Sequence, residues 1–184
     1  TGLITASGDF STNVGYSSWG CIFYAALGAH STTADTPSTG IHTHLYEPAS
    51  TLPSYTILKQ IGGSFEDTFV GAKVNTLSIA STPGRRMTLS VGLMARQKSG
   101  RATSVTAITP VTPNFVHDKH LSAGTGKITW NGADYCIQTW TFTLNNQLER
   151  TNCSGSDFSD EPEQGESPRT AVISCRGKFK DQTL

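Results

Sequence analysis

The segment FVGAKVNTLSIASTPGRRMTLSVGLMAR, residues 69–96, decides the fold class of this chain. From Met87 to Arg96, apolar residues alternate with polar or small ones, a pattern typical of a β-strand with one buried face. Pro83-Gly84 marks a turn before that strand. Residues 70–80 and 86–96 are therefore expected to form a β-hairpin.

The first strand of this hairpin contains a break in its pattern. Its apolar residues change faces along the strand, with Val70, Ala72 and Val74 on one face and Leu77 and Ile79 on the other. Two interpretations remain open. Either a β-bulge near Asn75 brings both sets to one side, or the strand is buried on different sides along its length.

Outward from this hairpin, further segments carry strand signals, namely residues 3–14, 54–60, 127–130, 135–144 and 170–180. Asn131-Gly132 lies between the third and fourth of them, and Asn-Gly between apolar runs is a strong signal for a second hairpin. Residues 30–50, 97–126 and 153–168 are polar and are expected to be loops. The chain is thus expected to be mainly antiparallel β, as a single domain over residues 1–184.

One segment, residues 17–28, has the pattern of an α-helix. Ser17 or Ser18 is a candidate N-cap, and Gly28 stands where a C-cap glycine belongs. Helical spacing places its apolar residues in one stripe, formed by Trp19, Ile22, Phe23, Ala26 and Leu27. Such a stripe must be buried, and a sheet is the expected partner.

Charge and hydropathy exclude two classes of function. The chain has 14 basic and 14 acidic residues and a formal net charge of zero. A protein that binds DNA tightly must neutralise phosphates and usually has a basic excess, so passive contact with DNA is the most that we expect. No stretch of 18 apolar residues is present, so we expect no membrane insertion.

Catalytic and metal-binding motifs are weak in this sequence. It contains no nucleophile elbow, metalloprotease helix, phosphate-binding loop or dinucleotide fingerprint. His42 and His44, and His117 and His120, lie in expected loops without Cys or carboxylate at ligand spacing, so we interpret them as ordinary loop residues. The acidic residues of 157–166 lack the alternation of a calcium loop. We therefore expect no enzymatic activity, no metal and no cofactor.

The four cysteines, Cys21, Cys136, Cys153 and Cys175, leave two alternatives open. Their even number permits two disulfides if the protein is exported, although no CxxC pair is present. Cys21, Cys136 and Cys175 lie on apolar faces, which favours the alternative of buried thiols in a reducing compartment.

Three ordered segments resemble the tail tube proteins of long-tailed bacteriophages. They are residues 44–57 (HLYEPASTLPSYTI), residues 69–79 (FVGAKVNTLSI), and residues 128–132 followed by 142–149 (ITWNG and FTLNNQLE). The resemblance covers roughly residues 6–180. Ala72 departs from it, because a cysteine is expected there. Family members also carry more chain before the equivalent of Gly8, so the resemblance predicts that an N-terminal segment is lacking.

This resemblance implies an antiparallel β-sandwich or partly open barrel with one flanking helix. It further implies a structural virion protein, not an enzyme, that is assembled in the host cytoplasm and located in the virion tail. The expected partners are other copies of the chain in stacked hexameric rings, other tail proteins, and double-stranded DNA in passage.

Candidate contact and lumen residues follow from these patterns. Inter-subunit or inter-ring contacts are expected from the broken strand and the polar loops, at Val74, Leu77, Pro110, Pro113, His117, Asp157 and Glu161. Polar strand faces are expected either to line a wet lumen or to be ordinary solvent faces, at Thr88, Ser90, Thr139, Thr141 and Thr143. Residues 30–50 and 97–126 are the loops expected to join rings.

Two other functions remain open at this point. One is a secreted β-sandwich binding module, for which the four cysteines would form disulfides. The other keeps the assembly but makes the chain a tail terminator or the inner tube of a contractile system.

Overall fold

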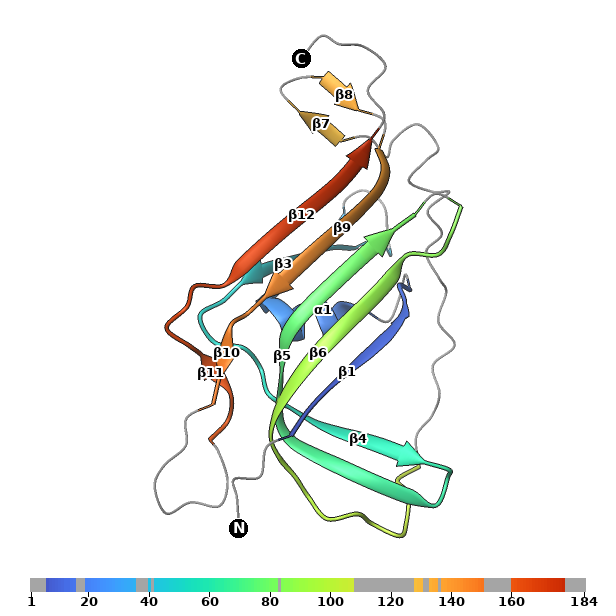
Figure 1. Ribbon diagram of the computed structural model, residues 1–184, viewed down its shortest axis with the longest axis vertical. Coiled ribbons are helices and arrows are strands. Elements are labelled where there is room, and N and C mark those ends of the chain that lie inside the picture. Colours follow the sequence, from blue (N-terminus) through green and yellow to red (C-terminus); the bar gives the residue numbers. More distant parts are fainter. Residues whose placement is uncertain are drawn as a thin grey trace.

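A computed structural model describes residues 6–15, 19–35, 40, 42–82, 84–107, 128–130, 133–135, 137–150 and 160–177 (Figure 1). Its elements, in chain order, are β1 (Ala6–Asn13), α1 (Gly20–Leu27), β2 (Gly28–Ala34), β3 (His42–Pro48), β4 (Tyr55–Ile61), β5 (Phe65–Ser81), β6 (Thr88–Lys98), β7 (Ile128–Trp130), β8 (Ala133–Tyr135), β9 (Ile137–Asn145), β10 (Leu148–Glu149), β11 (Glu163–Gln164) and β12 (Thr170–Gly177).

The main sheet has the strand order β1-β6-β5-β9-β12, and β4 pairs with the first part of β5. Every pairing is antiparallel, and the described strands do not close into a barrel (Figure 1). The expected mainly antiparallel β fold with one flanking helix is confirmed, and the arrangement is consistent with a β-sandwich. The expected hairpin of residues 70–80 and 86–96 is also confirmed, as the β5–β6 pair.

The long strand β5 contains the irregularity that its sequence indicated. The register with β6 shifts between Val74 and Thr76, so Asn75 is an extra residue on this strand. An extra residue offsets the two-residue period of side chains, and the apolar residues on both sides of it then face the same core. Val74 and Leu77 have only 3% and 1% of their surface exposed. The bulge interpretation is therefore confirmed.

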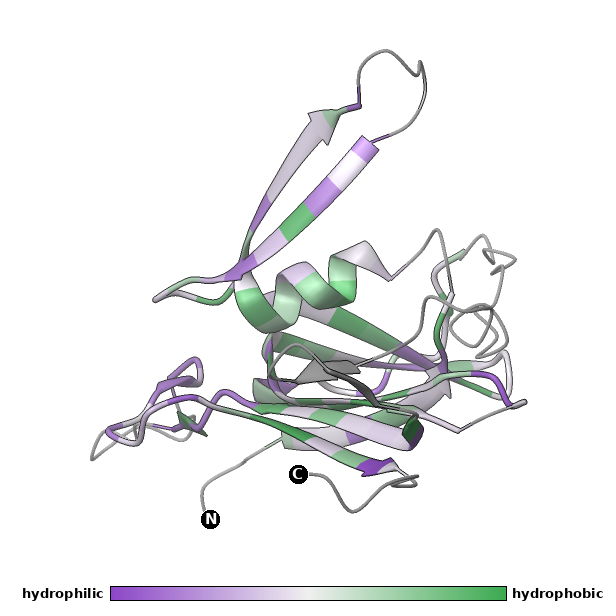
Figure 2. Cartoon of the chain, turned by 90° about the horizontal axis from the view of Figure 1, so that it is seen from above, coloured by the Kyte–Doolittle hydropathy of each residue, from purple (hydrophilic) through white to green (hydrophobic). Residues whose placement is uncertain are grey.

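Helix α1 packs on one face of the main sheet, above β5 (Figure 2). Its apolar stripe contacts a core that includes Leu77, Leu89, Val91 and Leu144. Gly28 ends the helix with φ +98, and a Cβ there would lie 2.8 Å from the carbonyl oxygen of Thr51, so glycine is required. The predicted start is wrong, because the helix begins at Gly20 after Trp19, without a side-chain cap. Ser17 and Ser18 lie outside the described residues.

Residues 30–50 do not form the expected loop. Strands β2 and β3 pair in register from Gly28 opposite Pro48 to Ala34 opposite His42. This hairpin, here called the arm, projects from the end of α1 away from the main sheet (Figure 2). Most of its residues are exposed on both faces, so its sequence lacks the apolar alternation that identifies a half-buried strand.

The second predicted hairpin is shorter than expected. Residues 128–130 pair with residues 133–135, whereas β9 pairs with β5 and β12. The long segment Tyr135–Leu144 is thus divided between a small hairpin and the main sheet. The turn residues Asn131 and Gly132, and residues 108–127, lie outside the described part of the chain.

Candidate functional site

The face of the main sheet opposite α1 is lined by small hydroxyl side chains. Strand register aligns Ser11, Ser90, Ser78 and Thr143 in one row across four strands. The hydroxyl oxygens of Ser11 and Ser90 lie 2.7 Å apart, and those of Ser78 and Thr143 lie 3.4 Å apart. These hydrogen bonds join neighbouring strands through their side chains, and they leave a flat polar surface.

All five residues expected to line a lumen lie on this polar face. A second row consists of Asn13, Thr88, Ala80, Thr141 and Ser174. Thr139 continues the alternation of β9 and lies opposite Arg176 of β12. Neither of the two rows contains a charged side chain, so their surface offers hydrogen bonds but no ion pairs to a phosphate backbone.

Two strands end the main sheet, β1 on one side and β12 on the other. Within the described residues each pairs with one neighbour only, so each presents an open row of backbone donors and acceptors. All residues of β12 are exposed, and Ile173 has 66% of its surface exposed. An exposed apolar edge of this kind is a template for pairing with another chain.

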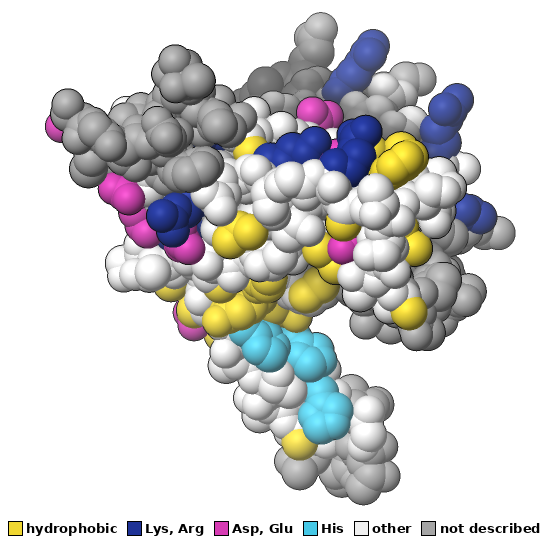
Figure 3. Space-filling view, turned by 90° about the horizontal axis from the view of Figure 1, so that it is seen from below, with side chains coloured by type: hydrophobic (Ala, Val, Ile, Leu, Met, Phe, Trp, Pro, Cys, Tyr) yellow, Lys and Arg dark blue, Asp and Glu magenta, His cyan; other side chains and the backbone are white. Residues whose placement is uncertain are grey.

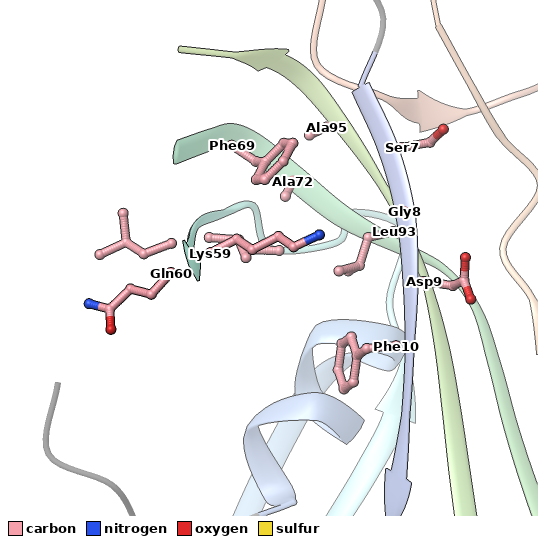
Figure 4. A pocket seen from close by; sticks show the side chains of 12 residues that line it. Ser7, Gly8, Asp9, Phe10, Lys59, Gln60, Phe69, Ala72, Leu93 and Ala95 are labelled. Carbon is pink, nitrogen blue, oxygen red and sulfur yellow. The ribbon is translucent and has the colours of Figure 1, made fainter. Parts of the chain in front are cut away.

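An apolar groove of about 480 Å³ lies beside the β1 edge, between β1 and β4 (Figure 4). Phe10, Phe69 and Leu93 project into it, whereas Ser7 and Asp9 point to the other side of β1 (Figure 4). Phe10 is exposed in this single chain. The groove therefore continues the β1 edge with apolar surface that a second chain would remove from water.

Charged side chains attach residues 99–107 to the start of β5. Asp67 is buried and accepts hydrogen bonds from Lys98 Nζ at 2.8 Å and Arg101 Nε at 3.0 Å. Glu66 accepts bonds from the backbone N–H and the hydroxyl of Thr106, at 2.9 and 3.0 Å. Arg101 and Lys98 hold the pKa of Asp67 well below its usual range, and the Thr106 N–H lowers the pKa of Glu66.

A similar contact attaches the segment around β11 to the sheet. Lys73 has 3% of its surface exposed, and its ammonium donates to Glu163 at 2.6 Å, with Glu161 at 3.8 Å. Glu161, expected to contact another subunit, thus faces Lys73 of its own chain while remaining partly exposed.

The other residues expected at contacts have different positions. Val74 and Leu77 lie in the core of this chain, because the bulge turns both inward, and they have little surface to offer a neighbour. Pro110, Pro113, His117 and Asp157 lie outside the described residues.

Sequence patterns missed several features of this surface. His42 and His44 lie on strand β3, not in a loop; the ring of His44 contacts His30 of β2, and the ring of His42 lies beside that of His44. Cys21 and Cys175 are exposed, so the expectation of buried thiols is wrong for these two. Cys175 shares a strand face with Ala171 and Ile173, as a core residue would, but its strand lies at the edge of the sheet.

The described residues contain no helix long and apolar enough to cross a membrane. Within the same residues, no group of three or more His, Cys, Asp or Glu side chains is arranged to hold a metal ion.

Comparison with known proteins gives one match that covers the whole chain. The search of curated proteins found no match. A family model described as phage tail tube protein matches residues 1–184, with the three resembling segments inside that range. This chain belongs to the phage tail tube protein family and is therefore a structural protein of the virion tail.

Proposed function

We propose that copies of this chain associate side by side into rings, and that the rings stack into a tube through which double-stranded DNA leaves the capsid. The resemblance gives six copies per ring. Assembly takes place in the host cytoplasm together with other tail proteins. DNA passes without being tightly bound.

One observation carries this proposal: among the described residues the main sheet is open, with β1 and β12 as its edge strands, and its two faces differ in character. Its apolar face is covered by α1, and its opposite face is polar and uncharged in the two central rows. A chain with different edges at its two sides makes head-to-tail contacts, which close into a ring when the rotations between neighbours add up to a full turn. The polar face then lines the wet interior.

Strand spacing indicates why several copies are needed. Neighbouring strands lie about 4.8 Å apart, so the five strands of one chain would close into a cylinder only about 8 Å across. The major groove of DNA is already about 12 Å wide, so a whole duplex could not pass through such a cylinder. Six copies would give a wall about 45 Å across between backbones, before strand tilt is included. The duplex therefore requires a wall shared between subunits.

The arm and the groove supply contacts beyond the sheet edges. The arm extends away from the body of the subunit (Figure 2), and most of its described residues are exposed. The apolar groove lies beside β1, where the next subunit of a ring would sit. Both surfaces are therefore candidates for contacts between copies.

Electron microscopy of the purified full chain tests the proposal. We expect rings or tubes from the wild type and their loss in Ile173→Lys, because a charged side chain on an edge strand opposes strand addition. Ile173→Thr is the matched control, since it keeps a β-branched residue without the charge, and it should still assemble. A wild-type chain that stays monomeric across concentrations and salts would refute ring formation.

A further inference from the structure

Three histidines lie on one face of the arm, at the edge of the molecule (Figure 3). His30 of β2 lies opposite Tyr46 of β3, and Thr32 lies opposite His44. His42 follows two residues from His44 on the same strand, and side chains two residues apart share a face. None of these side chains has a role in the function proposed above.

His30 and His44 approach each other through their ring nitrogens. His30 Nε2 lies 3.3 Å from His44 Nδ1, and the Thr32 hydroxyl lies 3.0 Å from each nitrogen. The His30 ring stacks on the ring of Tyr46, with centroids 4.9 Å apart, and it meets the ring of His44 edge to edge through these nitrogens, with centroids 5.6 Å apart. Stacking on Tyr46 orients the His30 ring toward His44.

The separation of these nitrogens equals that of two ligands of one ion, and a small rotation of each ring would turn both lone pairs toward that ion. Tetrahedral zinc has Zn–N bonds of 2.0–2.1 Å, so two of its nitrogen ligands lie about 3.3–3.4 Å apart. We propose that His30 and His44 form a binding site for a divalent transition-metal ion of the zinc class. Imidazole nitrogens favour zinc, copper or nickel over magnesium or calcium, which prefer oxygen ligands.

Binding requires that both facing nitrogens carry a lone pair. Each ring proton then resides on the other nitrogen, His30 Nδ1 and His44 Nε2. Without metal, the same atoms form a hydrogen-bonded group in which the Thr32 hydroxyl donates its hydrogen to one of the two nitrogens. With metal, that hydroxyl lies where it can bond to a water on the ion, as outer-shell partners do.

Two ligands from one chain leave coordination positions open. The His42 ring centroid lies 6.5 Å from that of His44, so rotation of its side chain would bring a third imidazole toward the ion. Water molecules would occupy the remaining coordination positions of the ion. The ion would link β2 to β3 across the arm, and a two-stranded hairpin outside the main sheet is marginally stable by itself. Metal binding would thus stiffen the arm.

Calorimetric titration of the full chain with zinc chloride tests the site. We expect binding by the wild type, and an affinity at least about tenfold lower in His30→Asn and in His44→Asn, because loss of an outer-shell partner alone costs about 10–100-fold. Glu47→Gln is the matched control. It alters a possible ligand on the opposite face of the arm and should bind zinc as the wild type does.

Hydrogen exchange of the arm amides gives a second readout that separates binding here from binding elsewhere. Zinc should slow exchange of β2 and β3 in the wild type and in Glu47→Gln, and should have no effect in His44→Asn. Unchanged affinity in both histidine variants, or zinc binding without protection of the arm, would overturn the proposal. Ring formation is measured separately by microscopy, so the two proposals can fail independently.

Discussion

Asn146 joins three parts of the molecule at one buried point. Its side-chain amide donates to the carbonyl oxygen of Ala26 at 2.9 Å and to that of Val74 at 2.8 Å. Its backbone N–H donates to Asn75 at 2.8 Å. The last carbonyls of a helix lack partners within the helix. Asn146 thus satisfies the end of α1 while fixing the bulge of β5.

Replacement of this amide should destabilise the subunit. Asn146→Ala removes two buried hydrogen bonds, to the carbonyl oxygens of Ala26 and Val74, and we expect the free energy of unfolding to fall by about 2–4 kcal/mol. Urea denaturation followed by circular dichroism measures the loss. Asn145→Ala is the control, since it removes one bond, to the Gln147 N–H, and should lose about 1 kcal/mol. Equal losses in the two variants would contradict this role.

Acid should release residues 99–107 from β5. The pKa values of Asp67 and Glu66 are lowered in the folded chain, so their contacts stabilise it above the ordinary carboxyl pKa of about 4. That stabilisation is lost as the pH falls below this value toward the folded pKa. Hydrogen exchange of residues 99–107, corrected for intrinsic rates, should therefore accelerate between pH 5 and about pH 3.

Two variants distinguish this mechanism from general acid unfolding. Asp67→Asn should loosen the segment already at neutral pH and respond less to acid, because the carboxylate that titrates is gone. Asp9→Asn, on the polar face, should respond as the wild type does. An acid response in Asp67→Asn as large as that of the wild type would rule the mechanism out.

At the scale of the element, the bulge decides which face of β5 meets the core. Without Asn75 the second half of the strand would shift by one residue, and a one-residue shift moves every side chain to the opposite face. Leu77 would then leave the core for the polar face. Asn75 also accepts a hydrogen bond from the Leu148 N–H at 2.8 Å, which attaches β10 at the same place.

Deletion of Asn75 should therefore prevent folding, while its substitution should not. Replacement of a buried residue such as Leu77 by Ala lowers the free energy of unfolding by about 2–5 kcal/mol. Deletion of Asn75 would move both Leu77 and Ile79 out of the core, so its cost should be larger. Asn75→Ala keeps the residue count and loses one hydrogen bond, about 1 kcal/mol or slightly more. Soluble yield and circular dichroism of the two variants check the difference. A folded deletion variant would show that register tolerates the shift.

At the scale of the whole molecule, the polar face becomes the wall of a channel if the chain assembles as proposed. A charge placed there is repeated in every subunit of every ring. Such a wall should have little affinity for phosphates, and both central rows of the face are uncharged.

Thr143→Lys in phage particles should slow DNA release. Lysine side chains facing the duplex would bind phosphates, and that attraction weakens as salt displaces it. Ejection measured by DNA-dye fluorescence should be slow at low salt and recover at high salt. Thr143→Gln adds length without charge and should eject normally. A normal rate in Thr143→Lys at low salt would place Thr143 outside the channel wall.

The sequence by itself determined the antiparallel β class, the β5–β6 hairpin and the apolar stripe of α1, whereas it located the break near Asn75 without deciding that it is a bulge. These are local patterns, and burial of one face imposes a period on the residues that carry it. The three family motifs in order also identified the family, which the family match confirms.

Tertiary structure alone decided the rest. Most residues of the arm are exposed, so its sequence lacks the alternation of apolar and polar residues that identifies a strand. Neither its two strands nor the contact between His30 and His44 could therefore be predicted from the sequence. Val74 and Leu77 turned inward, and Cys175 became exposed, because burial depends on which strand is central and which is at the edge. Strand order arises from pairings between distant residues, and no local pattern encodes them.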